Sequence, residues 1–177
     1  MKFSRAMKSL SFRRLQGAEM AAQIRISVQP EDFDIGLETA ALAIAGTGGV
    51  NSFLGVVRHQ NDNADVRCLR LEHYPGMTEA QIQTIIEEAE SRWDVLAATV
   101  IHRIGDLYPG DQIVFVGVAS THRGDAFNAC EFIIDFLKTR ATFWKKEFTP
   151  DSDRWLTTRK TDLDTASAWQ ASEADPH

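Results

Sequence analysis

Cysteine is scarce in this sequence, with only Cys68 and Cys130 among 177 residues. The two lie far apart and form neither a Cys-x-x-Cys pair nor a zinc-binding pattern, so their spacing predicts no metal site and no redox motif. Each is flanked by residues of a predicted helix or strand, which favours two buried, reduced thiols over a disulfide. Reduced thiols are typical of the cytoplasm, and we expect the protein there.

Other marks of known site types are also missing. The sequence has no GxGxxG, P-loop, GxSxG or HExxH pattern, and its five histidines are scattered, so we expect no metal and no cofactor. No apolar run reaches the roughly 20 residues that cross a bilayer. The net charge of −6 removes any global attraction to polyanions and argues against binding to nucleic acid.

The two ends of the chain differ in composition from its middle. Residues 1–17 are basic and serine-containing, without an acidic residue. This composition is typical of an organellar transit peptide, and an upstream start codon, with Met20 opening the folded protein, explains it equally well. We therefore expect an extension at residues 1–19, a folded domain at 20–162 and an acidic, flexible tail at 163–177.

Apolar alternation, helical stripes and turn residues together predict an α+β domain. The expected strands are Gln23–Val28, Val50–Val57, Cys68–His73, Val95–Ile104 and Ile113–Val118. The expected helices are Phe33–Ala45, one that follows Pro75-Gly76, and Arg123–Arg140. Their interleaved order, with at least one hairpin, favours helices packed on a mixed, largely antiparallel sheet.

Three local features refine this picture. Thr78 and Gln81 are expected to form a capping box for the helix after Pro75-Gly76, and the segment His59–Asp65 is expected to be a mobile polar loop. Each long helix is expected to bury one apolar face. These faces are Ile82, Ile85, Ile86, Ala89 and Trp93 in the first and Phe127, Cys130, Ile134 and Leu137 in the second.

Basic residues gather in one segment of this acidic chain. Between Lys138 and Glu147, four cations surround the aromatic pair Phe143 and Trp144. A local cluster of this kind indicates a site for an anion, with an aromatic wall for a ring-bearing ligand. The alternative is a helix that ends in solvated Lys and Arg side chains, which suit the negative end of the helix dipole.

Two other groups favour an anion for the same reason. The stretch Ser120–Arg123 begins a helix, where free N–H groups bind phosphate and His122 and Arg123 add charge; the alternative is an ordinary cap by Ser120 or Thr121. Arg58-His59 lies at the end of a strand, beside the polar loop. Arg58 is there either a contact for an anion or a solvated charge at the edge of the sheet. Lys138 and Lys145 are candidates for acid, base or nucleophile, or are two surface lysines.

Whole strings of this sequence resemble those of the large, catalytic subunit of molybdopterin synthase. The strings are Phe53-Leu-Gly-Val-Val-Arg58, Leu71-Glu-His-Tyr-Pro-Gly-Met77, Val100-Ile-His-Arg-Ile-Gly-Asp106 and Lys138-Thr-Arg-Ala-Thr-Phe-Trp-Lys-Lys146. The likeness extends through Tyr108–Asp111, Ser120–Arg123 and Asp153–Trp155, and covers about residues 22 to 162.

The resemblance implies a fold, an assembly and a reaction. That family has an α/β hammerhead fold and forms a central dimer with a small ubiquitin-like subunit at each end. The partner's C-terminal Gly-Gly tail carries a thiocarboxylate and inserts into the large subunit. Two sulfurs pass to cyclic pyranopterin monophosphate, which gives the dithiolene of molybdopterin. Thus the resemblance implies a sulfurtransferase of molybdenum cofactor biosynthesis.

The resemblance also implies roles for individual residues. Lys138 would act as an acid, base and electrostatic group beside the thiocarboxylate carbonyl, and Lys145 would stabilise negative charge as an acyl intermediate forms and is hydrolysed. Phe143 and Trp144 would position these lysines, and Arg140 would be a structural or interface charge. Arg58, His122 and Arg123 would hold the phosphate, with help from across the dimer interface. The full substrate-contacting set is Val56, Val57, Arg58, His122, Arg123, Lys138, Lys145, Lys146 and Glu147.

A non-catalytic protein is the alternative to this enzyme. The same basic pocket would then bind a phosphorylated ligand or the acidic tail of a partner, and it would form no product. The presence or absence of product, rather than binding, distinguishes the two functions.

Overall fold

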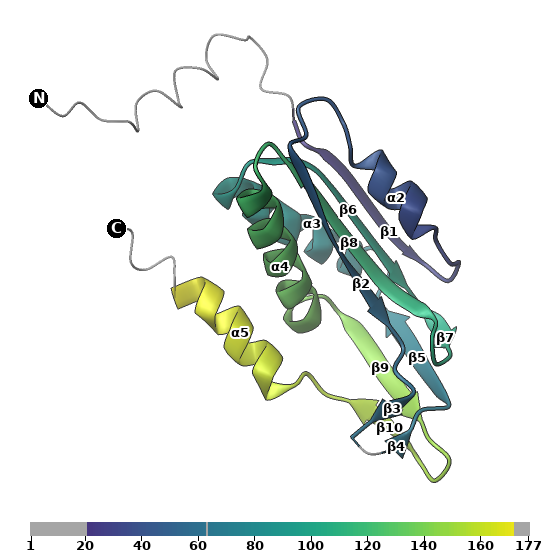
Figure 1. Ribbon diagram of the computed structural model, residues 1–177. Coiled ribbons are helices and arrows are strands. Elements are labelled where there is room, and N and C mark those ends of the chain that lie inside the picture. The colour runs from purple at the N-terminus through teal and green to yellow at the C-terminus, as the bar shows by residue number, and fades with distance from the viewer. Residues whose placement is uncertain (1–20, 63, 172–177) are drawn as a thin grey trace, which may run out of the picture.

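The computed structural model describes residues 21–62 and 64–171 of the chain (Figure 1). The helices are α2 (Ile35–Ala41), α3 (Met77–Arg92), α4 (Arg123–Thr139) and α5 (Lys160–Ala171). The longer strands are β1 (Gln23–Gln29), β2 (Gly49–Val56), β5 (Cys68–His73), β6 (Val95–Arg103), β8 (Gln112–Ser120) and β9 (Phe143–Phe148). The shorter strands are β3 (Gln60–Asn61), β4 (Ala64–Asp65), β7 (Gly105–Leu107) and β10 (Asp153–Leu156). The extension expected at residues 1–19 lies outside the described residues.

The strands form two four-stranded sheets and a short hairpin. The larger sheet has the order β1-β6-β8-β2, in which only β1 and β6 are parallel. The smaller sheet, β10-β9-β5-β7, is antiparallel throughout, and β3 pairs with β4. Among the described residues the sheets are therefore mixed and largely antiparallel, as predicted from the sequence, but they are two separate sheets.

Helices cover both faces of the larger sheet, which explains why its central strands β6 and β8 read as continuous apolar runs. Helices α3 and α4 pack on one face, against side chains such as Val100 and Val116. On the other face, Leu42, at the end of α2, packs against Phe115 and Ile101. Figure 1 shows the sheet between α2 on one side and α3 and α4 on the other. The predicted burial of β8 on both faces is confirmed.

Several helix predictions need correction. Helix α2 is shorter than expected, since Asp34 caps it by accepting from Leu37 N–H and its helical conformation stops at Ala41. The capping box predicted for Thr78 and Gln81 is wrong: the carboxylate of Glu79 accepts from Gly76 N–H instead.

Both predicted capping residues bind elsewhere. The Thr78 hydroxyl and the Gln81 side chain bind Thr142, the residue before β9. These bonds tie α3 to the segment between α4 and β9. The side chains of Thr78 and Gln81 therefore make tertiary contacts instead of capping α3.

The apolar faces of α3 and α4 were predicted with one error. The stripe from Ile82 to Ala89 on α3 is buried, as predicted, and Trp93, the residue after the helix, is partly buried against the same core. On α4, Cys130, Ile134 and Leu137 are buried, but Phe127 is 54% exposed. The buried stripe of α4 also includes Ala126 and Ala129. Small residues there let the helix lie close to the sheet and leave Phe127 outside.

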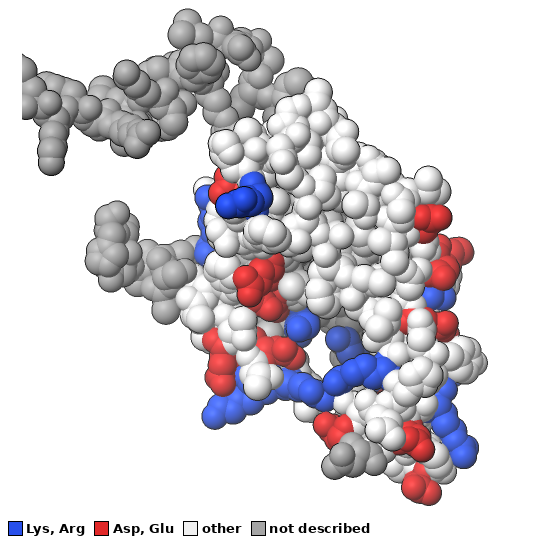
Figure 2. Space-filling view, viewed as in Figure 1, with Lys and Arg blue, Asp and Glu red and all other residues white. Residues whose placement is uncertain are grey.

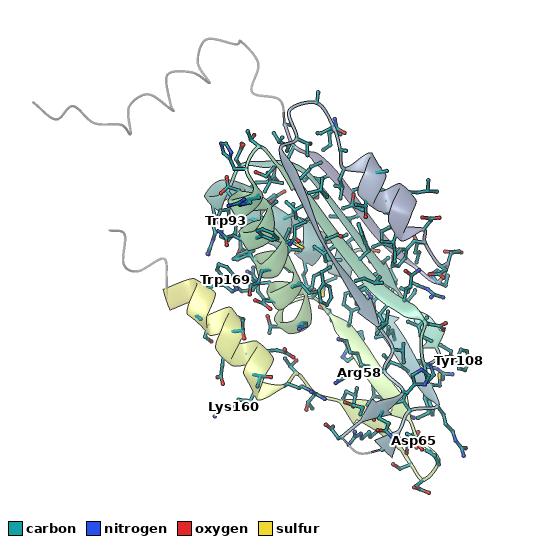
Figure 3. All side chains as sticks on the ribbon, viewed as in Figure 1. Arg58, Asp65, Trp93, Tyr108, Lys160 and Trp169 are labelled. Atoms are coloured by element: carbon teal, nitrogen blue, oxygen red, sulfur yellow. The ribbon has the colours of Figure 1, made fainter. Side chains whose placement is uncertain are left out.

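The expected flexible tail is largely helical in the structure. Residues 160–171 form α5, which packs against α4. The Trp169 indole N–H donates to Asp135 at 3.0 Å, and its ring meets Trp93 and Phe132 edge to face (Figure 3). The segment is ordered because one large aromatic residue reaches the core, whereas its polar composition suggested a tail. Residues 172–177 lie outside the described part of the chain.

Candidate functional site

A cavity of about 950 Å³ opens where the two sheets meet below the end of α4. Its wall comes from the end of β2, the β3–β4 hairpin, the last turn of α4, one face of β9, and residues 154–162. Figure 2 shows Lys and Arg side chains gathered around this hollow. Six lining residues are cationic and three are carboxylates. They are Arg58, Lys138, Lys145, Arg154, Arg159 and Lys160, against Asp62, Glu147 and Asp162.

We call this opening the cationic cavity. The chain as a whole has a net charge of −6, yet this wall has an excess of positive charge. A concave surface lined by one sign of charge concentrates oppositely charged ligands. The geometry therefore favours an anionic ligand, in agreement with the sequence prediction for this segment.

Lys138 and Lys145 come together because α4 runs almost directly into β9. Lys138 lies in the last turn of α4, 40% exposed, and forms an ion pair of 3.6 Å with Asp162. Lys145 faces the cavity from β9. Burial lowers the pKa of Lys145, and the nearby charge of Lys138 lowers it further, while Asp162 acts in the opposite direction. Two lysine ammonium groups and one carboxylate thus share the wall.

A stacked pair of rings forms the floor beside Lys145. The rings of His102 and Phe143 are stacked with centroids 3.7 Å apart, and both line the cavity. His102 is buried and its Nδ1 binds the carbonyl oxygen of Arg103 at 2.8 Å. Burial lowers the pKa of His102 to about 3, so the imidazole is neutral. Phe143 lies on the same cavity-facing side of β9 as Lys145, whereas Trp144 points to the other face of the strand and is 47% exposed.

A polar network forms the opposite wall. Glu147, only 2% exposed, accepts from Asn61 Nδ2 at 2.8 Å and from Arg154 at 3.0 and 3.1 Å. Asn61 Oδ1 accepts from Arg58 at 3.2 Å and from Arg159 at 2.7 Å. Arg58, labelled in Figure 3, lies at the end of β2 beside β9. The buried carboxylate is thereby fully hydrogen-bonded, as a buried charge must be.

The cavity does not contain every residue that the resemblance implied. Six of the nine predicted substrate contacts line it: Val56, Val57, Arg58, Lys138, Lys145 and Glu147. Lys146 does not, because side chains alternate along a strand and it points to the outer face of β9. There it forms an ion pair with Asp153 and lies 5.2 Å from the Phe148 ring centroid.

His122 and Arg123 are also absent from the cavity wall. They lie at the start of α4, beside the opposite end of β2, where a Cβ on Gly49 would meet the Arg123 Cα at 3.3 Å. Strand β2 runs from Gly49 to Val56, which at about 3.3 Å per residue puts Arg123 roughly 23 Å from the far end of the strand, where Arg58 follows. Ser120 Oγ accepts from His122 N–H at 3.2 Å, but His122 itself is the N-cap residue of α4 and makes no side-chain cap hydrogen bond, so the alternative of a cap by Ser120 or Thr121 is wrong. A single copy of the chain does not bring these residues to the cationic cavity.

The cysteines and Arg140 lie outside the cavity as well. Cys130 is buried in the core, and burial raises its pKa to about 12. Cys68 is free but only partly buried, so the prediction of two buried thiols holds for one of them. Arg140 forms a two-pronged ion pair with Glu88 of α3 at 2.7 Å, a structural contact and thus one of the two roles predicted for it.

Four residues of the site were not singled out by the sequence. Asn61 sits in a segment that resembles an ordinary polar loop, and His102 sits within a buried strand. Arg159 and Asp162 sit at a polar end of the predicted domain. His102 lies in one of the strings that carry the resemblance but was given no role there, and the other three lie in no motif; only the fold shows that the four face the same space.

No helix among residues 21–62 and 64–171 is long and apolar enough to cross a membrane. The same residues contain no group of three or more His, Cys, Asp or Glu side chains arranged to hold a metal ion.

Comparisons with known proteins point in one direction. A family model described as "MoaE protein" matches residues 28–140. The molybdopterin synthase catalytic subunit of Escherichia coli (strain K12) is 51% identical over 149 residues, which cover 84% of this chain and 99% of that protein. The subunit of the same name from Ralstonia nicotianae is 53% identical over 146 residues, 81% of this chain and 83% of the relative.

Solved structures agree with the sequence relatives. Molybdopterin cofactor biosynthesis protein E from Burkholderia multivorans has a TM-score of 0.71 at 46% identity, covering 84% of this chain and 97% of its own. Molybdopterin synthase from Staphylococcus aureus has a TM-score of 0.69 at 29% identity, and the match covers 78% of this chain and 99% of the chain in that structure. These structures share the α+β fold described above.

Proposed function

The chain belongs to the MoaE protein family, and we propose that it works as the catalytic subunit of molybdopterin synthase with the cationic cavity as its active site. The observation that carries this assignment of the site is the meeting of Lys138 and Lys145 at one wall. No cysteine lines the cavity in the part of the chain that the structure describes. In this proposal the sulfur comes from a partner that carries a thiocarboxylate.

The reaction begins with that partner, a small ubiquitin-like subunit whose C-terminal Gly-Gly tail ends in a thiocarboxylate. Its sulfur attacks a carbon of cyclic pyranopterin monophosphate and displaces the oxygen bound there, so that a new carbon–sulfur bond joins the partner's acyl group to the pterin. Water then cleaves the bond between acyl carbon and sulfur, so the sulfur stays on the pterin and the partner leaves as a carboxylate. A second thiocarboxylate repeats these steps at the neighbouring carbon and completes the dithiolene. Of the two displaced oxygens, one is the phosphate ester oxygen, whose release opens the cyclic phosphate, and the other leaves as water.

The two lysines serve different steps in this scheme. Lys138, the more exposed, reaches the carbonyl of the partner's tail, where it stabilises the oxyanion and transfers protons during hydrolysis. Lys145 is more deeply placed and holds positive charge near the reacting carbon. Arg58 binds the substrate phosphate at the rim. Phe143 and His102 form an apolar floor that keeps the Lys145 side chain in place.

Reconstitution is the direct test of the proposed function. The purified chain, mixed with thiocarboxylated partner and cyclic pyranopterin monophosphate, should yield molybdopterin, whereas the carboxylate form of the partner should yield none. Product is measured as its fluorescent oxidation derivative. Binding of substrate or partner without product would contradict the enzyme and favour the non-catalytic binding module.

His122 and Arg123 belong to this proposal through a second copy of the chain. Strand β2 is an outer strand of the larger sheet among the described residues, and its Phe53 and Val56 are exposed. Two copies that pair these edges about a twofold axis run antiparallel. The start of β2 in one copy, with Arg123, then lies beside the end of β2 in the other, with Arg58.

Mixing two inactive variants tests this shared site. We expect Lys138→Ala and Arg123→Ala to be defective alone but to recover about a quarter of wild-type activity when unfolded and refolded together, because half of randomly assorted dimers contain one intact site. Co-refolding each variant with itself is the control. If both residues act within one copy, every site keeps one defect and the mixture stays inactive.

Two further proposals concern the whole chain. We propose that the catalytic domain extends from residue 20 to the end of α5, because Trp169 packs into the core, with residues 1–19 as an extension. We also propose a cytoplasmic location, since the free thiols Cys68 and Cys130 suit a reducing compartment. The intact mass of the native protein, and its recovery after cell fractionation, test these proposals.

A further inference from the structure

Asn61 stands at the centre of the polar wall of the cationic cavity, between a buried carboxylate and two arginines. We propose that Asn61 is a positioning residue that directs the Arg58 guanidinium toward the substrate phosphate without cancelling its charge. This inference rests on the proposed function for the identity of the ligand. Asn61 is buried, makes three hydrogen bonds and lies among arginines whose charges are compensated to different extents.

The hydrogen bonds of Asn61 determine how its amide is oriented. The side chain is 8% exposed and is held in the β3–β4 hairpin. A carboxylate accepts and cannot donate, so the atom that faces Glu147 at 2.8 Å must be the NH₂ group. Guanidinium groups donate and cannot accept, so the atom that faces Arg58 and Arg159 must be the carbonyl oxygen. Both sides give the same orientation.

The three arginines of this wall differ in how far their charge is compensated. Arg154 pairs with Glu147 and Asp62 at 3.0 and 3.1 Å. Arg159 lies 3.4 Å from Asp62. The Arg58 side chain, within the described residues, has one hydrogen bond, to the neutral Asn61, and no ion pair. Arg58 therefore keeps its full charge and most of its five N–H donors for a ligand.

A neutral amide can both accept a hydrogen bond from Arg58 and donate one to Glu147 at this position. Aspartate has the same shape, but it would neutralise Arg58 and repel Glu147 across the former hydrogen bond. Alanine would leave Arg58 charged and unheld, so that the guanidinium would have to be ordered when the ligand binds. Asparagine accepts from the cation, donates to the anion and adds no charge. Asn61 thus lies between two groups of the wall. On one side the charges of Arg154 and Arg159 are compensated by carboxylates, and on the other Arg58 remains available to bind the phosphate.

The test compares the affinity of cyclic pyranopterin monophosphate for variants of the chain, measured by calorimetry without the partner, so that turnover is not required. We expect Asn61→Asp to raise the Kd about 10- to 100-fold, which corresponds to losing one charge-assisted contact. Asn61→Ala should raise it less, about 3- to 10-fold, since the charge of Arg58 remains. Gln60→Glu is the matched control, because it makes the same amide-to-acid change on an exposed side chain of the same hairpin.

A double-mutant cycle separates positioning from general damage to the fold. In an Arg58→Ala background, Asn61→Asp should change the Kd by less than about threefold, because coupled residues are not additive. An unchanged Kd for both Asn61 variants would overturn the proposal, and so would an equal effect with and without Arg58. Should Asn61→Asp fail to fold in urea titrations, Asn61→Ala and the same cycle decide the question. Normal binding without product by the wild type would instead contradict the proposed function.

Discussion

Replacing Lys138 by alanine is expected to lower kcat/KM at least about 1,000-fold in the reconstituted reaction. Loss of one oxyanion donor typically costs about 100- to 1,000-fold, and loss of a positioned acid or base costs about 100- to 10,000-fold. Lys138 combines both roles beside the carbonyl of the partner's tail. The defect should appear in kcat, because the charge that Lys138 stabilises develops during the reaction.

The fold should tolerate this change. Lys138 is partly exposed and its ion pair with Asp162 is 3.6 Å long, a contact that contributes at most about 1 kcal/mol. Urea unfolding should therefore give a nearly unchanged free energy. Arg140→Ala is the matched control, since it removes a cation two residues away that pairs with Glu88, and it should retain activity. Near-normal turnover by Lys138→Ala would remove this residue from the mechanism.

The fold was largely predictable because its longer elements have strong local patterns. The apolar run of β8 and the helical stripe of α3 lie where the sequence placed them. The pattern failed where a distant contact decides the structure. Thr78 and Gln81 bind Thr142, some 60 residues away, and Trp169 orders α5 by packing on Trp93. Such contacts leave no local signal.

The same limit applies to the site. Lys138 and Lys145 are close in the sequence, and a short connection between α4 and β9 keeps them close in space. Arg58, in contrast, is separated from Arg123 by the length of β2, and nothing in either segment reveals this. Asn61 was hidden for a different reason: a polar residue in a polar loop gives no indication that it is buried. Burial of a polar group is a property of the fold, and here it points to function.

The second large effect is expected for Lys145→Met, which should be far less active and yet more stable than the wild type. Loss of a preorganised cation at the reacting carbon should lower kcat about 100- to 1,000-fold. Burial lowers the folded-state pKa of Lys145 below 10.5, so folding is opposed while the side chain is charged. Methionine fills similar space without a charge, and urea unfolding at pH 7 should therefore give a higher free energy.

The pH dependence of stability tests independently whether charged Lys145 destabilises the fold. In the wild type, charged Lys145 lowers the free energy of unfolding. This destabilisation is fully present below the folded-state pKa of Lys145 and disappears as the pH rises from there toward 10.5. The free energy of unfolding should therefore rise across this window, and Lys145→Met should lack this rise. A variant that is less stable than the wild type at pH 7 would contradict the assignment of a desolvated cation.

Activity should change in the opposite direction over the same window. If the protonated form of Lys145 is the functional one, turnover falls as the pH rises through its lowered pKa. Asp162 raises the pKa of Lys145, so Asp162→Asn should move this fall to lower pH. Lys145→Arg should abolish the fall, because a guanidinium stays charged throughout, and an unmoved alkaline limb in both variants would assign the titration to another group. The burial that weakens the fold around Lys145 is also what strengthens its charge in the reaction, since a cation acts most strongly where water is excluded.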